Sequence, residues 1–409
     1  MNILLINHYA GSPRYGMEFR PYYLSREWNK QGHNTLIVAA NFSHLRRQQP
    51  EKLGFESIDG ITYCWIKTLK YKSNGVRRFL SMLQFVTKLW FNNKKYLNDF
   101  KPDVVIASST YPLDIYPAKK IAKHYGAKLI YEVHDLWPLS PMELGGYSKW
   151  HPFILIMQTA EDYCYKHCDA VVSLLPKAED YMSTRGLAKG KFFYVPNGVV
   201  LDDWEKPEAI PNEYQSLIKS LKSSGTFLVA YAGSHGIANS LYSIIDAVGW
   251  LSKENIHLFL LGTGNEKENL IKYVKSKNYI NITFLNPINK LAVPTFLKEM
   301  DLLYIGLQKQ SLFRFGISPN KIFDYMMASK PIIQAIDAGN NLVKEANCGI
   351  YVEPDNIDEI KEGILNIANM SEEERSNLGK NGYNFVMENH TYNVLGRNFI
   401  NVLEKILSE

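Results

Sequence analysis

The sequence predicts an α/β protein built from two consecutive doubly wound, Rossmann-like domains. Three observations support this prediction. The chain has 409 residues, more than a single hydrophobic core usually organises. Short, continuous apolar runs alternate with segments of helical periodicity, which is typical of parallel strands covered by helices on both faces. A polar stretch, 203–225, separates two such series. We therefore expect two facing sheets with a cleft between them, a preferred place for a small-molecule site.

The first series opens with an apolar run at 1–9, a glycine-containing loop and a helix at 17–33. Its further strands are expected at 34–41, 61–68, 102–109, 127–134, 169–175 and 192–198, and its further helices at 76–98, 114–125, 152–167 and 177–186. The second series is expected to have strands at 226–234, 256–264, 280–286, 300–307, 330–336 and 348–354, with helices at 240–253, 266–277, 290–299 and after Pro319. We predict domains over 1–200 and 201–385, and a C-terminal helix within 386–409 that could pack back on the first domain.

Composition narrows the class of protein. Hydrophobic residues make up 46% and charged residues 21%, as in ordinary soluble proteins, and no apolar run reaches the ~18 residues of a membrane span. The N-terminus lacks the basic region of a secretory signal, so a cytoplasmic location is expected. The four cysteines form no disulfide framework. Cys164, His167 and Cys168 resemble one helix face more than a metal site, so we predict no metal.

Charge is distributed unevenly. Residues 1–200 contain 26 Lys and Arg against 16 Asp and Glu, whereas residues 201–409 contain 20 against 25. A basic half suggests an anionic partner: nucleic acid, an anionic membrane surface or a phosphorylated substrate. The basic residues form no nucleic-acid-binding motif, and we predict no nucleic-acid partner. The basic, apolar segment 75–95 could be an amphipathic helix lying on a membrane or a core helix with basic ends.

Glycines follow several predicted strands, where backbone amides can approach a phosphate. Such loops contain Gly11 and Gly16, then Gly233, Ser234, His235 and Gly236, and then Gly262 and Gly264. None is the Gly-x-Gly-x-x-Gly dinucleotide fingerprint. A further candidate is the helix start at Lys321, preceded by Arg314, because a helix N-terminus favours anions. The segment "HDLWP" brings His134 and Asp135 to the end of a buried strand, which points them toward the expected cleft.

Taken in order, several motifs resemble glycosyltransferase family 4, retaining enzymes of the GT-B fold, and most closely its bacterial surface-polysaccharide branch. They are the first glycine loop, "GHNTLIVAA", "HDLWP", "VPNGV", "YAG", "GTGNEKENL" and "SPNKIFDYMMASKP". The resemblance implies that His134 contacts the donor sugar, that the Gly11–Gly16 loop lies near the diphosphate and that Asp324 binds the ribose. The first acid of the family's Glu-x7-Glu motif falls on Gly316, and its phosphate-binding Arg and Lys fall on Ser234 and near Asn239. We expect Lys321 to replace them on the phosphate.

The resemblance implies a transferase that uses a nucleotide-sugar donor, with UDP and an N-acetylated hexosamine favoured, and a glycan or polyprenyl-diphosphate-linked acceptor. Catalytic roles are expected for His134, Asp135 and Lys321, and substrate contacts also for Arg20, Ser318 and Asn320. Neither cofactor nor metal is expected, and contact with the inner leaflet of the membrane is possible. Two alternatives stay open: a UDP-sugar epimerase, and a non-catalytic binding subunit suggested by the replaced residues at Gly316 and Ser234.

Overall fold

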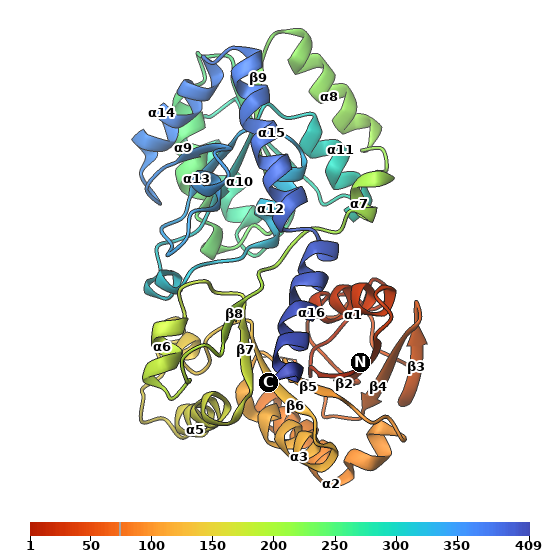
Figure 1. Cartoon of the computed structure of the whole chain (residues 1–409). Helices are drawn as coiled ribbons and strands as arrows, with labels where there is room; N and C mark the ends of the chain where they lie inside the picture. The colour runs from red at the N-terminus through yellow and green to blue at the C-terminus, as the bar shows by residue number, and fades with distance from the viewer. Residues whose placement is uncertain (73–74) are drawn as a thin grey trace. The chain divides into compact units, whose positions relative to one another are not determined.

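The computed structural model describes residues 1–72 and 75–409, which divide into two units (Figure 1). The first unit comprises Met1–Asn197, Phe315–Ser318 and Tyr392–Glu409, and the second comprises Gly198–Arg314 and Pro319–Thr391. The short segment Phe315–Ser318, which lies inside the predicted second domain of 201–385, belongs to the first unit. The chain therefore enters the first unit three times.

The first unit is built on an eight-stranded sheet of order β3-β4-β2-β1-β5-β6-β7-β8. Its strands are β1 (Asn2–Ile6), β2 (Asn34–Ala40), β3 (Gly54–Ile58), β4 (Ile61–Ile66), β5 (Val104–Ala107), β6 (Lys128–Val133), β7 (Ala170–Ser173) and β8 (Phe192–Tyr194). All pairs are parallel except β3 with β4, which is antiparallel. β3 was not predicted, because its exposed edge position leaves it without a long apolar run.

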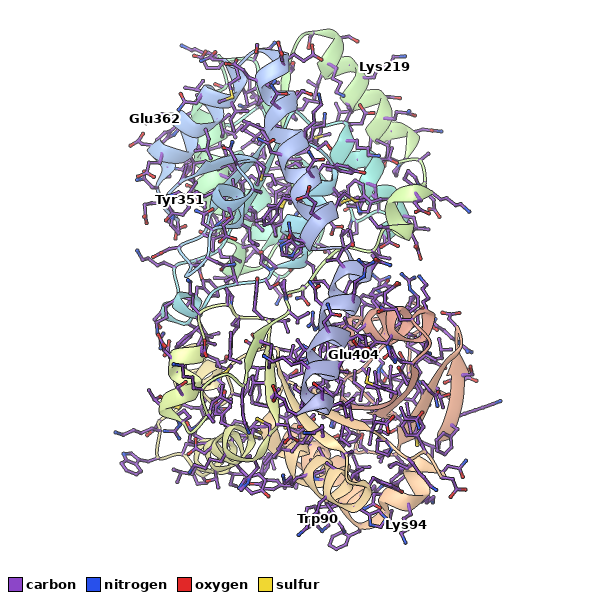
Figure 2. The ribbon with its side chains drawn as sticks, in the orientation of Figure 1. Trp90, Lys94, Lys219, Tyr351, Glu362 and Glu404 are labelled. Carbon is purple, nitrogen blue, oxygen red and sulfur yellow. The ribbon has the colours of Figure 1, made fainter. Side chains whose placement is uncertain are left out.

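Helices cover this sheet. They are α1 (Arg20–Lys30), α2 (Val76–Leu97), α3 (Ile115–Tyr125), α4 (Leu139–Glu143), α5 (Pro152–His167), α6 (Glu179–Thr184) and α16 (Tyr392–Ser408). The apolar stripe of α2 is part of the core, with Phe85 and Leu89 fully buried. That stripe is therefore not free to lie on a membrane. Trp90 and Lys94 of the same helix lie at the surface (Figure 2).

The second unit contains a six-stranded, all-parallel sheet of order β11-β10-β9-β12-β13-β14. Its strands are β9 (Phe227–Ala232), β10 (Ile256–Leu261), β11 (Ile282–Leu285), β12 (Leu302–Gly306), β13 (Ile332–Ala335) and β14 (Gly349–Tyr351). Its helices are α7 (Asp202–Glu205), α8 (Asn212–Ser223), α9 (Leu241–Trp250), α10 (Lys267–Ser276), α11 (Val293–Lys298), α12 (Asn320–Met327), α13 (Leu342–Glu345), α14 (Ile357–Ala368) and α15 (Glu372–Asn389). This strand order is that of a Rossmann fold.

Each sheet has a topological switch point, where the strand order reverses beside its first strand. In the first unit it lies between β1 and β5, and in the second between β9 and β12. Ligands of doubly wound sheets bind at the carboxyl ends of the strands next to this point. Within the described residues, no helix combines the length and apolar character needed to span a bilayer.

Candidate active site

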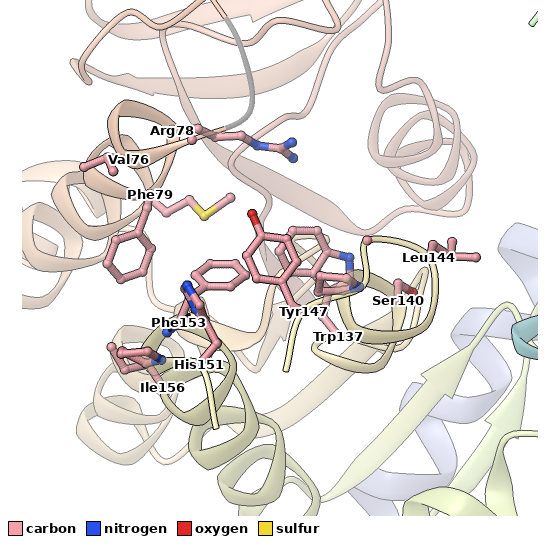
Figure 3. Close-up of a pocket in the computed structure, with 15 residues that line it drawn as sticks. Val76, Arg78, Phe79, Trp137, Ser140, Leu144, Tyr147, His151, Phe153 and Ile156 are labelled. Carbon is pink, nitrogen blue, oxygen red and sulfur yellow. Dashed lines mark hydrogen bonds between the residues drawn. The ribbon is translucent and has the colours of Figure 1, made fainter. Parts of the chain in front are cut away.

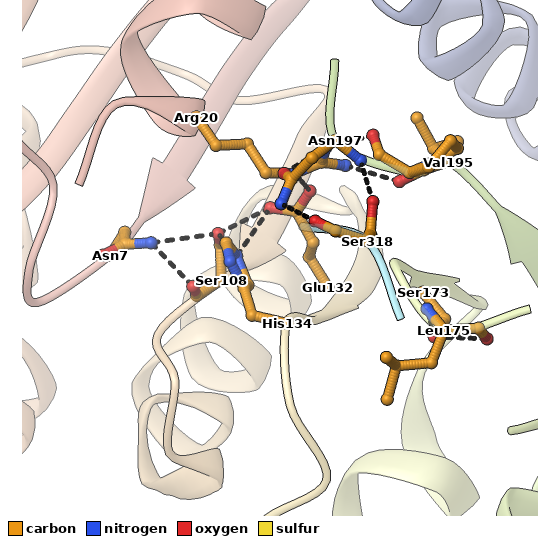
Figure 4. Close-up of polar contacts among 11 residues, drawn as sticks. Asn7, Arg20, Ser108, Glu132, His134, Ser173, Leu175, Val195, Asn197 and Ser318 are labelled. Atoms are coloured by element: carbon orange, nitrogen blue, oxygen red, sulfur yellow. Dashed lines mark hydrogen bonds and ion pairs between the residues drawn. The ribbon is translucent and has the colours of Figure 1, made fainter. Parts of the chain in front are cut away.

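In the first unit, polar side chains meet at the carboxyl ends of β1, β5 and β6 (Figure 4). Asn7 follows β1 and its Nδ2 donates to the carbonyl oxygen of Ser108 at 2.7 Å, so the two strand ends are tied across the switch point. The Ser108 hydroxyl lies 3.1 Å from Nε2 of His134, which follows β6. The side chain of His134 is 12% exposed, so one edge of the ring remains accessible.

A buried ion pair lies beneath His134. Arg20 Nε is 2.9 Å from Glu132 Oε1, and both side chains are only 1% exposed. The other Glu132 oxygen accepts a 2.6 Å hydrogen bond from Ser108 and lies 3.4 Å from His134 Nε2. Burial would raise the pKa of Glu132, but the Arg20 charge and the His134 contact outweigh it and lower that pKa to about 2. The carboxylate therefore stays ionised.

Glu132 in turn acts on His134. Burial disfavours the charged imidazolium, but the hydrogen bond and negative charge of Glu132 outweigh this and raise the pKa of His134 above 6.5. A ring held by two partners has a fixed orientation, which suits a residue that must meet a substrate atom. Glu132 was missed in the sequence, although a carboxylate inside the buried run "KLIYEVHD" is a signal in itself.

The structure corrects the predicted role of Arg20. Besides Glu132, its guanidinium donates to the carbonyl oxygens of Val195 and Pro196 at 2.9 and 2.6 Å. With these bonds and 1% exposure, Arg20 orders the protein and is not available to a substrate. Ser318 is also engaged: its hydroxyl accepts from the Asn197 amide at 2.8 Å, and its carbonyl oxygen accepts from Asn197 Nδ2 at 3.0 Å.

The first glycine loop is similarly occupied. The Gly11 amide donates to the carbonyl oxygen of Glu18 at 2.7 Å, and the Gly16 amide donates to that of Ser12 at 2.8 Å. A Cβ on Gly11 would lie 1.9 Å from the Gly16 carbonyl oxygen, and Gly16 has a φ of +106°. These glycines are needed for a tight loop, and their own amides are not available as phosphate donors. Asp135, next to His134, is exposed.

In the second unit, Lys321 reaches the end of β9 from the first turn of α12. Its Nζ donates to the Tyr231 hydroxyl at 2.7 Å and to Asn239 Oδ1 at 3.2 Å, and it lies 4.3 Å from the centre of the Tyr231 ring. The helix is anchored there by Tyr325, whose hydroxyl accepts from the Ala232 amide at 2.8 Å. Among residues 1–72 and 75–409, no carboxylate pairs with Lys321. Burial lowers the pKa of Lys321 to about 8.

The loop after β9 offers amides beside this ammonium group. Gly233 packs directly against Lys321, since an added Cβ would be 2.8 Å from Nζ. The amides of Gly233 and His235 donate to the carbonyl oxygens of Leu261 and Thr263. Within the part of the chain that the structure describes, those of Ser234 and Gly236 have no acceptor. Of the four backbone amides predicted as phosphate donors, those of Ser234 and Gly236 are therefore available. They follow Gly233, which packs against the Lys321 ammonium group, and that group has no carboxylate partner among the described residues.

The loop after β10 supports the loop after β9. A Cβ on Gly262 would lie 1.9 Å from the Gly233 carbonyl oxygen, and one on Gly264 would lie 2.3 Å from that of His235. These two glycines let the loops touch, which is a different role from the predicted phosphate contact. His235 is fully buried between them. Burial, with Lys267 and Lys321 nearby, lowers its pKa to about 4, so the ring is neutral at pH 7.

The other predicted residues on or just before α12 are Asp324, Asn320 and Arg314. Asp324, three residues after Lys321, faces the α7 region: burial raises its pKa to about 6, against the charge of Lys290 and a hydrogen bond from Trp204. Asn320 is exposed at the start of α12. Arg314 is exposed and donates to the carbonyl oxygen of Ser311 at 2.6 Å. Across the described residues, no three His, Cys, Asp or Glu side chains are grouped so that they could hold a metal ion.

Comparison with known proteins gives the same picture at the level of fold and family. The family model described as Glycosyltransferase Family 4 matches residues 15–203, and that described as Glycosyl transferases group 1 matches residues 215–385. No curated protein sequence matches the chain.

Solved structures are similar over the whole chain. Sucrose-phosphate synthase from Thermosynechococcus elongatus has a TM-score of 0.69 at 14% identity, covering 100% of this chain and 99% of that one. HepE from Anabaena, in complex with UDP, has a TM-score of 0.68 at 13% identity, covering 99% and 100%. WaaG, a glycosyltransferase of lipopolysaccharide biosynthesis, has a TM-score of 0.64 at 14% identity, covering 99% of each chain. With both family models matched in order on two Rossmann-like units, the chain belongs to the family 4 glycosyltransferases and has the GT-B fold.

Proposed function

We propose that this chain is a retaining glycosyltransferase that uses a UDP-linked sugar, with an N-acetylated hexosamine as the sugar class. The acceptor is a glycan or a lipid-linked sugar in the synthesis of a surface polysaccharide, reached from the cytoplasmic side. The observation that carries the donor assignment is Lys321: a largely buried ammonium group without a carboxylate partner among the described residues, beside the open amides of Ser234 and Gly236. A diphosphate supplies the anion that this arrangement lacks.

Similar proteins support the choice of nucleotide and product. HepE has been solved with UDP and with UDP-glucose, and the trehalose-6-phosphate protein of E. coli with UDP-2-fluoro glucose. WaaG and the galactosyltransferase WaaB are described as lipopolysaccharide enzymes. Asp324 is the candidate for the ribose hydroxyls. Its pKa of about 6 leaves it mainly ionised at neutral pH, as an acceptor of hydroxyl hydrogen bonds requires.

The proposed chemistry needs no protein nucleophile. The bond between the sugar's anomeric carbon and the diphosphate oxygen breaks, and its electron pair stays on that oxygen, which gains negative charge. Lys321 and the two amides stabilise this charge as it develops. The acceptor hydroxyl attacks the face that the diphosphate leaves, and its proton passes to the leaving phosphate oxygen. His134, oriented by Glu132 and Ser108, contacts the donor sugar. Metal independence remains a prediction.

Binding of UDP to a Lys321→Met variant tests the donor site. The substitution keeps an unbranched side chain but removes a charge-assisted hydrogen bond, so the Kd for UDP should rise by about 10-fold or more. Lys309→Met is the matched control, because Lys309 is 66% exposed and pairs with Asp337. Titration calorimetry with either Mg²⁺ or EDTA measures both variants. Unchanged UDP affinity in Lys321→Met would overturn the assignment, and dependence on Mg²⁺ would overturn metal independence.

Turnover of a His134→Ala variant tests the catalytic role in the first unit. Because His134 is proposed to act on the sugar and not on the nucleotide, kcat should fall by about 10² or more while the Kd for UDP stays unchanged. A rate assay with a UDP-linked N-acetylhexosamine as donor would measure this. A variant with wild-type kcat would exclude His134 from the chemistry.

A further inference from the structure

The first unit contains an apolar cavity of about 660 Å³ that the proposed donor site does not use (Figure 3). Helices α2, α4 and α5 and the "HDLWP" segment form it. Its apolar lining consists of Val76, Phe79, Met82, Trp137, Pro141, Leu144, Tyr147, Pro152, Phe153 and Ile156. The size is within the ~300–1,000 Å³ range of small-molecule sites. The lining suits a hydrocarbon group.

The rim of this cavity is unusually apolar for a surface. Val76 is 75% exposed, Leu144 53% and Tyr147 46%. Leu80 and Trp150, each adjacent in sequence to a lining residue, are 44% and 72% exposed. Large side chains of this kind gathered around one opening mark an interaction site more often than an ordinary surface.

Basic side chains lie on one side of the cavity's opening. A second hollow of about 560 Å³ shares Gly75 and Val76 with the cavity and is lined by Lys70, Lys72 and Arg77. These three side chains are exposed. Arg78 lines the apolar cavity itself, with its guanidinium 5.3 Å from the centre of the Tyr9 ring and 6.0 Å from that of Trp137. An apolar chamber therefore opens beside a cationic groove.

We infer that the cavity binds the hydrocarbon chain of the acceptor, and that the acceptor is an anionic amphiphile whose phosphate lies against Lys70, Lys72 and Arg77. This inference rests on the proposed function and names the acceptor class within it. Trp137 connects the two sites, since it lines the cavity and is three residues from His134 in one strand-end segment. A chain held beside Trp137 would therefore be bound by the same strand-end segment that carries His134.

Direct binding of a monomeric amphiphile to the full chain tests this inference. The probes are dodecyl phosphate below its micelle concentration, the uncharged dodecyl maltoside, and inorganic phosphate, followed by titration calorimetry. We expect dodecyl phosphate to bind, dodecyl maltoside to bind at least 10-fold more weakly and inorganic phosphate not to bind. Ile156→Glu should raise the Kd for dodecyl phosphate at least 10-fold. Leu155→Glu is the matched control, because Leu155 is similarly exposed on the same helix but does not line the cavity.

Arg77→Ala separates the charged groove from the cavity. It should weaken binding of dodecyl phosphate several-fold and leave that of dodecyl maltoside unchanged, whereas Lys94→Ala on the same helix should change neither. Equal affinity in Ile156→Glu and Leu155→Glu would overturn the inference. So would flotation with anionic vesicles in the absence of amphiphile binding, since the surface would then contact a membrane and not a single chain. UDP binding is measured separately, so loss of the donor assignment and loss of this inference are distinguishable.

Discussion

Glu132 is the residue that holds the side chains of the first unit's site in place. Its pair with Arg20 is buried on both sides, and its second oxygen holds Ser108 and His134. Glu132→Gln would leave the buried Arg20 charge without a counter-charge, with only carbonyl oxygens as partners, so unfolding free energy should fall by about 3–5 kcal/mol. The pKa of His134 should also fall, which NMR titration of its ring would show.

The control for this variant is a surface pair. Arg14, 64% exposed, pairs with Glu56, and Arg14→Ala should cost about 1 kcal/mol or less in urea denaturation. If the pKa of His134 did not change in Glu132→Gln, Glu132 would have only a structural role.

Glu161 should make the stability of the fold decrease as pH rises. It is fully buried on α5, where Tyr165 and Tyr181 each donate to it at 2.9 Å, and burial raises its pKa from 4.5 to about 7. The folded state therefore binds a proton more tightly than the unfolded state, and the stability contribution present below pH 4.5 is lost as pH rises through about 7. Relative to Glu161→Gln, wild-type stability should decrease across this window by up to about 3 kcal/mol.

Denaturation of both proteins at pH 4.5 and pH 7.5 measures this difference, and the exposed Glu179→Gln should keep the wild-type slope. Parallel pH profiles for wild type and Glu161→Gln would show that Glu161 does not titrate in this range.

Single residues were predicted unevenly from the sequence. His134 and Lys321 were predicted because strand ends and helix starts have a known chemistry; the structure gives both side chains hydrogen-bond partners, and their roles stay predictions. Arg20 was misjudged, since its burial depends on Glu132, Val195 and Pro196, which are distant in the chain. The amides of Gly11 and Gly16 were likewise taken as free, because the local hydrogen bonds of a loop are not visible in its composition.

Elements were predicted more reliably than residues where they are long, apolar and parallel. The strands of both sheets lie within the predicted ranges except β3, whose alternating burial at a sheet edge gives little apolar signal. The role of segment 75–95 could not be decided from its pattern, because a core stripe and a membrane stripe have the same spacing. Burial of Phe85 and Leu89 makes it a core stripe.

The contact between the loops after β9 and β10 yields a prediction at this scale. Gly262 has a φ of +145°, and its Cβ position overlaps the Gly233 carbonyl oxygen at 1.9 Å. Gly262→Ala should therefore displace the Gly233 loop, lower stability by about 1–3 kcal/mol and weaken UDP binding. Gly363→Ala, in α14 of the same unit, is the control, because its Cβ would meet only the side chains of Ile333 and Val352, at 3.4 Å or more. Titration calorimetry of both variants with UDP tests whether this loop contact supports the site. Normal UDP binding in Gly262→Ala would mean that it does not.

At the scale of the whole molecule, chain order and structural unit do not coincide. The C-terminal helix α16 belongs to the first unit although the second unit precedes it in the chain. Its contact with α1 is aromatic: the rings of Phe399 and Trp28 are centred 5.0 Å apart, as are those of Tyr392 and Tyr23. The C-terminal helix thus packs on α1, the helix that carries Arg20. A substitution in α16 should therefore affect the side chains at the carboxyl end of β6, which Arg20 contacts through Glu132.

Phe399→Ala tests this connection. Phe399 is fully buried, so the cavity left by its ring should cost about 3–5 kcal/mol of unfolding free energy. Because the lost contact lies within the first unit, hydrogen exchange should quicken in α1 and α16 but not in α12 or α15, and UDP should bind with wild-type affinity. Arg397→Ala on the same helix, at an exposed position, should leave exchange unchanged. Faster exchange in α12 after Phe399→Ala would mean that the two units unfold as one, and the C-terminal helix would then be coupled to the donor site as well.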